Sequence, residues 1–437
     1  MKAPQENLFS SSASICHPPS PVETVGRPRT FPNQGSSLTV SVVASLNAFR
    51  RLKNRWNALL ERSHSNCIFL TWEWLFTWWK WYGNNSDLFI LVIQDQANQI
   101  RGIAPLMARR TAAVFRRLQL IGSDSKVCSD FLDIIAEKGW EKHVAKCIMR
   151  FLVKTRSQWH VFVLSSIPSD SSFLAVLRRL PEFRRLMRHK KVQNTAPSLS
   201  YPGTWDKLLA RFGRSTRKSI TRKRRRIEKE FRVQFTPWSA LFDRTQTINT
   251  VKRLQQKSIS RKGLRGIFED ETYRNFHADI IDLFRREGWL YIVFLLCDGK
   301  PVAFLYAYLY GGKCYDYQRG FDTDYRSYSV GTVLQSYVFQ DTISKGVRTY
   351  DFLRGGEEYK YRFANSAREM LQVSFFNNRW SSVLLRLMLT GSRQVKSHIA
   401  DLLGKNLTEK IKVIKEASRV QKKKSRIVWS EDLGESH

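Results

Sequence analysis

Two patterns of hydrophobic and polar positions run along the chain, and each predicts a different kind of regular structure. In residues 45–61 apolar side chains recur at every third or fourth position, which is the spacing of a helix with one buried face. Residues 290–298 and 300–310 are apolar runs of strand length on either side of Asp298-Gly299. Because Asp-Gly is a preferred hairpin turn, this second pattern predicts two adjacent antiparallel strands.

The same patterns divide the chain into two segments in which helices and strands follow one another. In the first segment we expect helices at 45–61, 71–82 and 141–155, and strands at 88–94, 99–107, 115–122, 131–136 and 159–165. In the second we expect helices at 205–231, 242–257, 271–287 and 330–345, and strands at 290–298, 300–310, 313–320, 349–352 and 371–376. Each segment has a hairpin that leads to a helix, which indicates α+β lobes and a duplicated architecture.

The length of 437 residues favours two domains over one. Residues 1–36 are rich in Ser and Pro and predict a disordered leader. We expect an N-terminal lobe at 37–200, a C-terminal lobe at 201–385, and a basic helical or frayed tail at 386–437.

The charge is strongly positive, since 73 Lys and Arg residues face 38 Asp and Glu residues and give a net charge of +35. Such a surface attracts polyanions, including nucleic acid, anionic lipid and the phosphates of a cofactor. The densest basic stretch is the helix expected at 205–231, which contains Arg222–Arg226. This helix either binds a polyanion or is a solvated helix at the interface between the lobes.

The six cysteines include no CxxC pair, and the eight histidines include no HxxxH spacing, so no metal site is expected. Cys297 lies in an apolar run, which is typical of a reduced core cysteine in a cytoplasmic protein. The most apolar stretch, residues 68–82, contains Glu73 and Lys80 and is too short to span a membrane. It predicts a buried, aromatic-rich helix, and no secretory signal is expected.

The first candidate site is the segment YRSYSVGT at residues 325–332, between an expected strand and an expected helix. A glycine at a helix start leaves backbone N–H groups facing outward, and the helix dipole favours an anion there. A second interpretation is that the glycine only helps to cap the helix. The residues expected to bind a pyrophosphate are Arg326, Ser329, Val330, Gly331 and Thr332.

The second candidate site is the segment DFLRGGEEYKYRF at residues 351–363, directly after an expected strand. Charged side chains just beyond a strand end often line a cleft, and glycines let a ligand approach the backbone. The alternative is an exposed charged turn. The charged residues of this site are Asp351, Arg354, Glu357, Glu358 and Lys360.

The order of these segments resembles one known family. The resemblance is carried by WEWLFTWWKWYG, RGIAPLM, SDFLDI, the Arg-rich helix, QQKSISRKGLRGIFED, DGKPVAFLYAYLYGGKCYDYQRGFD, YSVG and DFLRGGEEYKYRF, which together span about residues 40–380. The chain is similar to the GNAT-superfamily domain of CelD-like (cellulose biosynthesis) and BioF-like proteins, which is related to the Fem peptidyltransferases. It departs from relatives at Gly356, where many carry an acidic residue, and at Val330, where many carry Pro.

The resemblance implies two fused GNAT lobes with mixed, mainly antiparallel sheets, and an acetyl-CoA or other acyl-CoA site in the second. The implied activity is transfer of an acyl group to an amine or hydroxyl of an envelope, glycan or lipid precursor. Glu357 or Asp351 is then the general base, and Lys360 binds phosphate or supports the oxyanion. Tyr317 or Tyr325 holds the leaving thiolate, and the residues implied to contact the acceptor are Asp322, Tyr325, Arg354 and Glu358.

Two other functions are compatible with the same resemblance. A Fem-like enzyme would transfer an aminoacyl group from charged tRNA, a polyanion that a charge of +35 suits. A GNAT-like scaffold without catalytic activity would serve in polysaccharide assembly.

Overall fold

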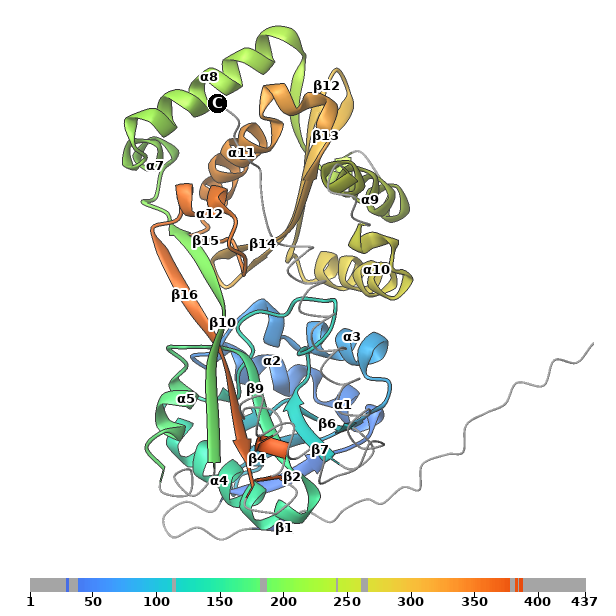
Figure 1. Ribbon diagram of the computed structural model, residues 1–437, viewed down its shortest axis with the longest axis vertical. Coiled ribbons are helices and arrows are strands. Elements are labelled where there is room, and N and C mark those ends of the chain that lie inside the picture. The colour runs from blue at the N-terminus through green and yellow to red at the C-terminus, as the bar shows by residue number, and fades with distance from the viewer. Residues whose placement is uncertain are drawn as a thin grey trace, which may run out of the picture.

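The computed structural model of the chain describes residues 29–30, 38–111, 115–180, 187–240, 243–260, 266–377, 382–383 and 385–387. They form two lobes, one above the other in Figure 1, with two long strands between them. Most of the predicted leader and tail therefore falls outside the described residues. Within the leader, Arg29–Thr30 forms the short strand β1 and pairs with β2 (Thr39–Val43).

The first lobe contains the elements from β2 to α5. Its helices are α1 (Leu46–Arg51), α2 (Lys53–Glu61), α3 (Trp72–Tyr82), α4 (Glu141–Lys154) and α5 (Ser172–Leu177), with the short 3-10 helices η1 (Ile68–Leu70) and η2 (Arg156–Gln158). Its strands after β2 are β3 (Ser86–Leu88), β4 (Ile90–Gln94), β5 (Ile100–Ala104), β6 (Leu106–Thr111), β7 (Phe115–Leu120), β8 (Ile135–Ala136) and β9 (Val161–Pro168). Thr71 begins α3, because its hydroxyl accepts a hydrogen bond from the Trp74 N–H and so satisfies one unpaired donor of the first turn.

The second lobe follows the long strand β10 (Met187–Ser200). Its helices are α7 (Trp205–Arg211), α8 (Arg214–Glu230), α9 (Arg244–Ser260), α10 (Glu271–Arg286), α11 (Val330–Ser344) and α12 (Glu358–Phe363), with the 3-10 helices η3 (Trp238–Ala240), η4 (Ile267–Glu269) and η5 (Thr323–Tyr328). Its strands are β11 (Val233–Pro237), β12 (Leu290–Cys297), β13 (Lys300–Tyr310), β14 (Lys313–Phe321), β15 (Thr349–Asp351) and β16 (Ser366–Phe376). Asp298 and Gly299 both have positive φ, 50° and 78°, which confirms the predicted hairpin turn between β12 and β13.

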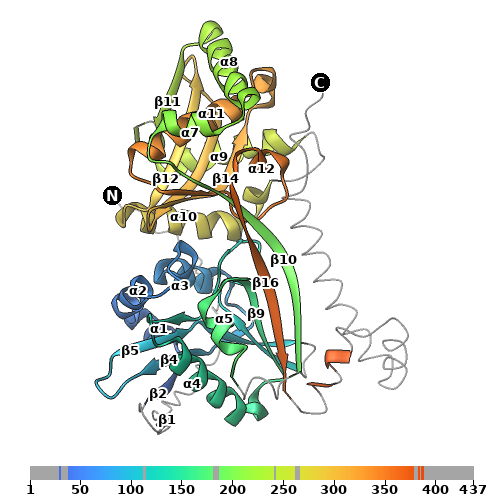
Figure 2. The same ribbon diagram turned by 90° about the vertical axis from the view of Figure 1, so that its left-hand side faces the viewer.

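Among the described residues, one sheet of eleven strands joins the lobes, in the order β11-β12-β13-β14-β15-β10-β16-β9-β7-β6-β3. Most neighbours are antiparallel, whereas β14–β15 and β7–β9 are parallel. Strands β10 and β16 lie side by side and run from one lobe to the other (Figure 2). A smaller sheet of five strands, β1-β2-β4-β5-β8, belongs to the first lobe.

The two lobes repeat one order of elements, as the sequence indicated. In the first, β2 is followed by helices, the β4–β5 hairpin, β7, the crossover helix α4 and β9, which is parallel to β7. In the second, β11 is followed by α9 and α10, the β12–β13 hairpin, β14, the crossover helix α11 and β15, which is parallel to β14. A parallel pair of strands needs such a crossover, and here each lobe supplies one.

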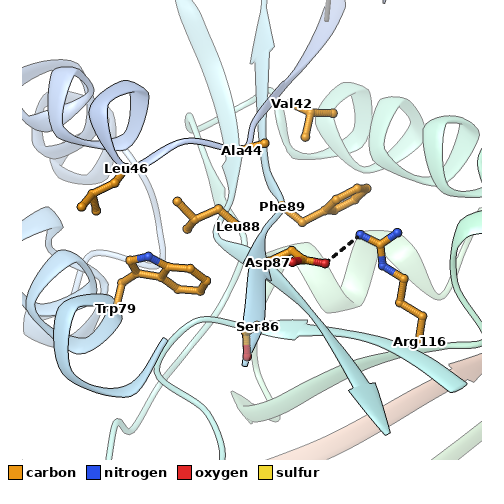
Figure 3. Close-up of a pocket in the computed structure, with 9 residues that line it drawn as sticks. All are labelled: Val42, Ala44, Leu46, Trp79, Ser86, Asp87, Leu88, Phe89 and Arg116. Atoms are coloured by element: carbon orange, nitrogen blue, oxygen red, sulfur yellow. Dashed lines mark hydrogen bonds and ion pairs between the residues drawn. The ribbon is translucent and has the colours of Figure 1, made fainter. Parts of the chain in front are cut away.

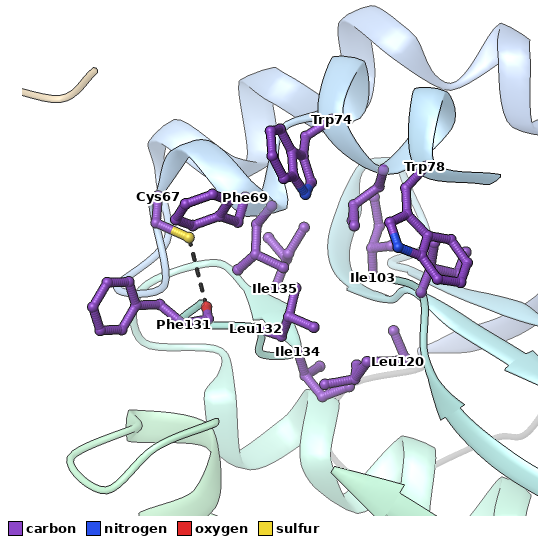
Figure 4. Close-up of a cluster of buried hydrophobic side chains, with 14 of the residues drawn as sticks. Cys67, Phe69, Trp74, Trp78, Ile103, Leu120, Phe131, Leu132, Ile134 and Ile135 are labelled. Carbon is purple, nitrogen blue, oxygen red and sulfur yellow. Dashed lines mark hydrogen bonds between the residues drawn. The ribbon is translucent and has the colours of Figure 1, made fainter. Parts of the chain in front are cut away.

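The core of the first lobe is built from its aromatic helix and the small sheet. Trp74 and Trp78 of α3 lie among aliphatic side chains that include Ile103 and Ile135 (Figure 4). The indole of Trp74 is buried, and its Nε1–H donates to the Ser129 hydroxyl at 2.9 Å. The sequence prediction of a buried helix is therefore confirmed. None of the described helices is both long and apolar enough to cross a lipid bilayer.

The helices of the second lobe lie on both faces of its sheet. Helices α7, α8 and α11 pack on one face, and α9 and α10 pack on the other (Figure 1). The face with α10 is directed at the first lobe, because Trp74 of α3 contacts the rings of Phe276 on α10 and Tyr308 on β13, at centroid distances of 5.1 and 5.7 Å. The aromatic residues of both lobes thus belong to one buried layer.

Some predicted elements differ from the structure in extent. The helix expected at 205–231 is two helices, because Phe212 and Gly213 are extended, with ψ of 145° and 152°. The strand expected at 131–136 is reduced to β8, since Phe131 has a φ of +56° that a strand does not accommodate. The hairpin expected at 88–107 is divided between the two sheets at Phe89 and Pro105, and proline has no N–H to donate to a ladder.

Candidate active site

The candidate active site begins where β14 and β15 diverge. These parallel strands pair only from Lys313–Thr349 to Tyr315–Asp351. Strand β14 continues to Phe321, whereas β15 ends at Asp351. Among the described strands, the part of β14 beyond Tyr315 has no partner on this edge. The segments predicted as sites, after β14 and after β15, therefore leave the same end of the sheet.

A β-bulge lies just beyond the point of divergence. On β13, Tyr306 is opposite Gln318 and Ala307 is opposite Asp316, so Tyr317 is the extra residue of β14. A bulge changes the direction in which the following side chains point, and bulges are common beside active sites. The structure thus places Tyr317, a predicted site residue, at a bulge next to the diverging strands.

The bulge turns two consecutive side chains toward the first lobe. The ring of Tyr317 lies 5.2 Å from that of His277 on α10, and the amide of Gln318 donates to the Tyr273 hydroxyl at 3.1 Å. The next residue, Arg319, lies on the opposite face and contacts α11. Tyr317 and Gln318 thus share the buried layer between the lobes with residues of α10.

Burial fixes the protonation of this layer. Tyr317 is 2% exposed, and burial raises the pKa of its phenol well above the ordinary value, so the hydroxyl keeps its proton. Burial lowers the pKa of His277 well below its ordinary value, so the imidazole is neutral at pH 7. Its Nδ1 lies 3.1 Å from the Tyr306 hydroxyl, and its Nε2 has no hydrogen-bond partner among the described residues. The layer therefore offers a phenol that can donate and a neutral imidazole that can accept.

Arg319 links β14 to the elements on the other side of the divergence. Its guanidinium pairs with Asp316 and donates to Gln335 of α11 at 2.6 Å. It also lies 4.7 Å from the ring centre of Tyr359 on α12, and the Tyr350 hydroxyl donates to Asp316 at 3.0 Å. This network holds β14, β15, α11 and α12 in one arrangement at the place where the strands separate.

The segment after β15 is anchored to the first lobe by a buried ion pair. The guanidinium of Arg354 pairs with Asp130, whose carboxylate is 1% exposed and also accepts the Arg354 backbone N–H at 2.8 Å. The same guanidinium donates to the Ser129 carbonyl at 2.6 Å and to the Ser166 hydroxyl at 3.0 Å. Arg354, predicted to contact the acceptor, therefore holds the two lobes together.

Unusual backbone conformations gather around this ion pair. Phe131, Ser166 and Leu353 each have a φ of +56°, in the left-handed region that side chains other than glycine rarely adopt. Gly355 has a φ of +143°, and a Cβ there would lie 2.0 Å from the Glu357 carboxylate. Strain of this kind is typical of functional sites and persists only where surrounding contacts impose it. Three of the described non-glycine residues with positive φ thus lie where SDFLDI meets DFLRGGEE.

Asp351 lies at this junction with a titration range shifted toward neutrality. Its side chain is 7% exposed, and its Oδ1 accepts the Leu353 N–H at 2.9 Å. Burial raises the pKa of the Asp351 carboxyl to about 7, and the nearby Asp130 carboxylate acts in the same direction. A carboxyl poised near neutral pH is suited to general-base catalysis.

The other acidic and basic groups of this segment have different surroundings. Lys360 is buried, 2% exposed, and its Nζ lies 2.8 Å from the Arg354 carbonyl and 2.9 Å from a Glu357 oxygen. The buried Lys360 side chain thus holds the GGEE turn in place, whereas the sequence analysis predicted that Lys360 lines an open cleft. Glu358 is exposed at the first turn of α12.

The start of α11 has the features expected of an anion site. Ser329 precedes the helix with a φ of 54°, and its hydroxyl does not cap the helix. Apart from its chain neighbours and the backbone of its own helix, no described atom lies within 4 Å of a Cβ built at Gly331, so the space beside this backbone is open. Arg326 is exposed and Thr332 is half-buried, whereas the Val330 side chain is buried in the core, so only its backbone can face a ligand.

Two residues before this helix have structural partners. Asp322 is fully buried and accepts two hydrogen bonds from Lys257 of α9, at 2.8 and 2.9 Å. Although burial opposes its ionisation, Lys257 holds the pKa of Asp322 below its ordinary value. Tyr325 packs on Phe231, with ring centres 5.6 Å apart. Asp322 thus fixes the loop between β14 and α11 to α9.

The predicted residues therefore fall into two groups on one edge of the sheet. One group follows β14 at the start of α11, and the other surrounds Asp351 and Arg354 at the lobe junction, near Tyr317. Sequence reasoning missed Asp130 and His277 as members of the site. Asp130 could have been found, because it lies in SDFLDI, a segment that carries the resemblance. His277 has no such signal, since it is one apolar-face position of an amphipathic helix.

A separate hollow of about 520 Å³ lies on the first lobe, away from these residues (Figure 3). Its walls are mostly apolar, and its charged groups, Asp87 and Arg116, pair with each other at 3.4 Å. It is lined by Val42, Ala44, Leu46, Trp79, Ser86, Asp87, Leu88, Phe89 and Arg116. This hollow contains none of the site residues predicted from the sequence.

Comparisons with known proteins find one matching family model and several similar solved structures. Residues 214–361 match the family model described as an acetyltransferase (GNAT) domain. Among solved structures, the chain is similar to FemX, with a TM-score of 0.54 and 10% identity over 78% of this chain and 98% of that one. It is also similar to the lysylphosphatidylglycerol synthetase L-PGS from Bacillus licheniformis, with a TM-score of 0.46 and 13% identity over 79% and 97% of the chains. A tandem GNAT protein from the clavulanic acid biosynthesis pathway has a TM-score of 0.40 and 9% identity over 78% and 100%. No curated protein matches the chain in sequence.

Most of the second lobe, residues 214–361, is thus similar to an acetyltransferase (GNAT) domain. The matched residues include β14, the bulge at Tyr317, the start of α11 and β15. The described residues have the predicted α+β fold of two fused lobes with mixed, mainly antiparallel sheets, a fold that they share with FemX.

Proposed function

We propose that the chain transfers an acyl group from acetyl-CoA or a longer acyl-CoA to an amine or hydroxyl of an envelope or polysaccharide precursor, in the manner of CelD-like and BioF-like acyltransferases, in the cytoplasm. One observation carries the proposal. The GNAT-matched segment contains the diverging parallel strands β14 and β15, a bulge in β14 where it pairs with β13, and an uncapped helix start with open space at Gly331. Phosphates are stabilised at such a helix start by backbone N–H groups and the helix dipole.

The residues at the junction fit the proton transfers that acyl transfer requires. The acceptor forms a bond to the acyl carbon and loses a proton, while the carbon–sulfur bond breaks and the thiolate leaves and is protonated. Asp351, with a pKa of about 7, accepts the proton of the acceptor. The phenol of Tyr317 keeps its proton and donates a hydrogen bond to the developing negative charge. Holding both reactants at the junction requires no covalent enzyme intermediate.

Calorimetric titration of acetyl-CoA and palmitoyl-CoA into the wild type and Gly331→Glu tests the cofactor. The glutamate adds bulk and negative charge at an open position of the α11 start, so we expect the variant to lose binding while its fold is retained. Gly213→Glu is the matched control, because Gly213 also stands at a helix start with no atom within 4 Å of its Cβ. We expect this control to bind as the wild type does.

The same experiment distinguishes the alternatives. At a concentration of 100 times Kd, acyl-CoA should stabilise the wild type by about 2.7 kcal/mol, which a thermal shift detects. Equal binding by the wild type and Gly331→Glu would place the cofactor elsewhere. If neither acyl-CoA binds, the proposal fails. Stabilisation by aminoacyl-tRNA would then support the Fem-like reaction, and no effect of either donor would support a scaffold.

A further inference from the structure

A row of cations without partners runs along the outer face of α8. Arg214, Arg217, Lys218, Arg222 and Arg225 recur at helical spacing, so their side chains lie on one side of the helix. All five are exposed, and no ion pair joins them to any described residue. We call these five side chains the outer row. Residues 207–227 contain ten Lys and Arg residues and no Asp or Glu, so no carboxylate of this stretch competes for the outer row.

Two other arginines of the same helix contact side chains of the second lobe. The guanidinium of Arg224 lies 3.7 Å from the ring centre of Tyr337 on α11 and donates to Gln340 at 3.2 Å. That of Arg226 lies 5.2 Å from the ring centre of Tyr328. The sequence showed basic residues on nearly every face, whereas the structure separates structural arginines from the outer row.

The outer row borders a hollow of about 500 Å³ between α7 and α8. Thr221 adds a hydroxyl to its wall, and Leu209 of α7 closes one side. The lining residues are Leu209, Arg217, Lys218, Thr221, Arg222 and Arg225. Four cations around one concave surface, with no anion among the lining residues, form a site for several phosphates on one ligand.

We propose that this face of α8 binds the phosphodiester backbone of double-stranded nucleic acid without reading its sequence. From Arg214 to Arg225 the helix extends about 16 Å, which corresponds to about five phosphates of one strand along a duplex axis. The outer row presents point charges and guanidinium groups, which bind phosphates but carry no sequence information directly. Helix α8 lies at the end of the molecule remote from the first lobe (Figure 1), so a long duplex can approach it.

The apolar residues of α8 argue against a membrane as the partner. A helix that lies in a membrane surface buries an apolar face in the lipid. Here Ile220 and Ile227 are buried against the protein, 3% and 0% exposed, and the outer row includes no apolar side chain. A concave charged surface also matches a rounded duplex backbone better than a flat bilayer.

The test measures binding of 20-bp RNA and DNA duplexes of the same sequence by fluorescence anisotropy at several salt concentrations. In Lys218→Glu/Arg222→Glu two phosphate contacts are lost. At 0.1 M salt each contact contributes about eightfold, so affinity should fall by about 60-fold and the salt slope by about two. Arg217→Gln/Arg225→Gln, which removes charge without reversing it, should shift both quantities in the same direction.

The control is Lys138→Glu/Lys142→Glu, which changes the net charge equally at exposed positions of the first lobe. It should leave the salt slope unchanged. The proposal is supported if either duplex binds the wild type and binds the outer-row variants more weakly and with a smaller salt slope. Comparison of the RNA and DNA duplexes shows which of the two is preferred. Equal weakening by the control and the outer-row variants would overturn the proposal, since net charge alone would then explain binding. Loss of binding to phosphatidylglycerol vesicles in the outer-row variants, with duplex binding unchanged, would overturn it in favour of a membrane.

Discussion

Replacing Asp351 by Asn should make the protein more stable and less active at the same time. The carboxyl is buried, and its pKa of about 7 compares with 3.8 for the ordinary group. Asparagine has the same shape and keeps an oxygen that accepts the Leu353 N–H. The substitution therefore removes the cost of a buried negative charge while it preserves the hydrogen bond.

The expected gain in unfolding free energy follows from the size and direction of the pKa shift of Asp351. Because the folded pKa is raised, the native carboxyl stays protonated between pH 4 and 7 while the unfolded one ionises. The native state then binds one more proton, and stability falls as pH rises through this window. A rise of about three pKa units corresponds to about 4 kcal/mol. Above pH 7, the ionised Asp351 carboxylate lowers the unfolding free energy by this full amount. Asp351→Asn should thus match the wild type near pH 4 and exceed its unfolding free energy by about 4 kcal/mol at pH 8.

Asp133 supplies a control with the same physics outside the proposed reaction. It is 3% exposed, its Oδ1 accepts the Ile134 N–H at 2.8 Å, and burial raises its pKa to about 7. Asp133→Asn should give a similar gain in stability at pH 8 and leave turnover of acyl-CoA with an accepted amine or hydroxyl substrate unchanged. In Asp351→Asn we expect kcat to fall by about 100-fold or more, which is typical for loss of a general base.

Urea unfolding at pH 4, 6 and 8, followed by tryptophan fluorescence, measures both variants. The reasoning would be refuted if Asp351→Asn gained nothing between pH 4 and 8, because the carboxyl would then be ionised in the native state throughout. Equal loss of turnover in the two variants would refute the assignment of the base. If Asp351→Asn became more stable and kept full activity, Glu357 rather than Asp351 would be the candidate for the general base.

Two further substitutions test the junction. Arg354→Met leaves the Asp130 carboxylate buried without its partner and should lower the unfolding free energy by about 3–5 kcal/mol. Adding Asp130→Asn to this variant should recover part of the loss. If the losses of the two substitutions were instead additive, the two side chains would not be coupled. Lys360→Met should lower the unfolding free energy by about 3 kcal/mol, because the buried Nζ of Lys360 contacts the Glu357 carboxylate and the Arg354 carbonyl. The control Glu358→Gln, at an exposed position, should change the unfolding free energy by less than about 0.5 kcal/mol. If Lys360→Met and the wild type were equally stable in urea, Lys360 would not stabilise the fold, and its role would be in function alone.

The second lobe was more predictable from sequence than the first. Its strands are continuous apolar runs, and Asp298-Gly299 fixes the register of the β12–β13 hairpin, so local pattern and tertiary structure agree. Strand β10 was missed because it is mostly polar and contains Pro197. Its conformation comes from pairing with β15 and β16, which is a tertiary effect that no local period records.

The candidate site was predictable in part for a similar reason. Asp351 and Gly331 stand beside strand and helix ends that the hydrophobic pattern locates, so their place on one edge of the sheet could be expected. The SDFLDI segment points to Asp130 as a candidate, but its pairing with Arg354 could not be predicted, because the two residues are 224 positions apart in sequence. The burial of Lys360 was also hidden, since a lysine beside two glycines and two glutamates is typical of an exposed turn.

The shared sheet explains why the two lobes occur in one chain. Within the GNAT-matched segment, β15 pairs with β14 on one side and with β10 on the other, and β10 in turn pairs with β16, which pairs with β9 of the first lobe. Cutting the second lobe at residues 214 and 361 would remove β10 and β16 and expose the edge of β15 at the proposed catalytic carboxyl. It would also remove Asp130, which fixes the turn after that strand. Residues outside the matched segment therefore hold the proposed site in position, because β10 pairs with the strand that ends at Asp351 and Asp130 of the first lobe pairs with Arg354.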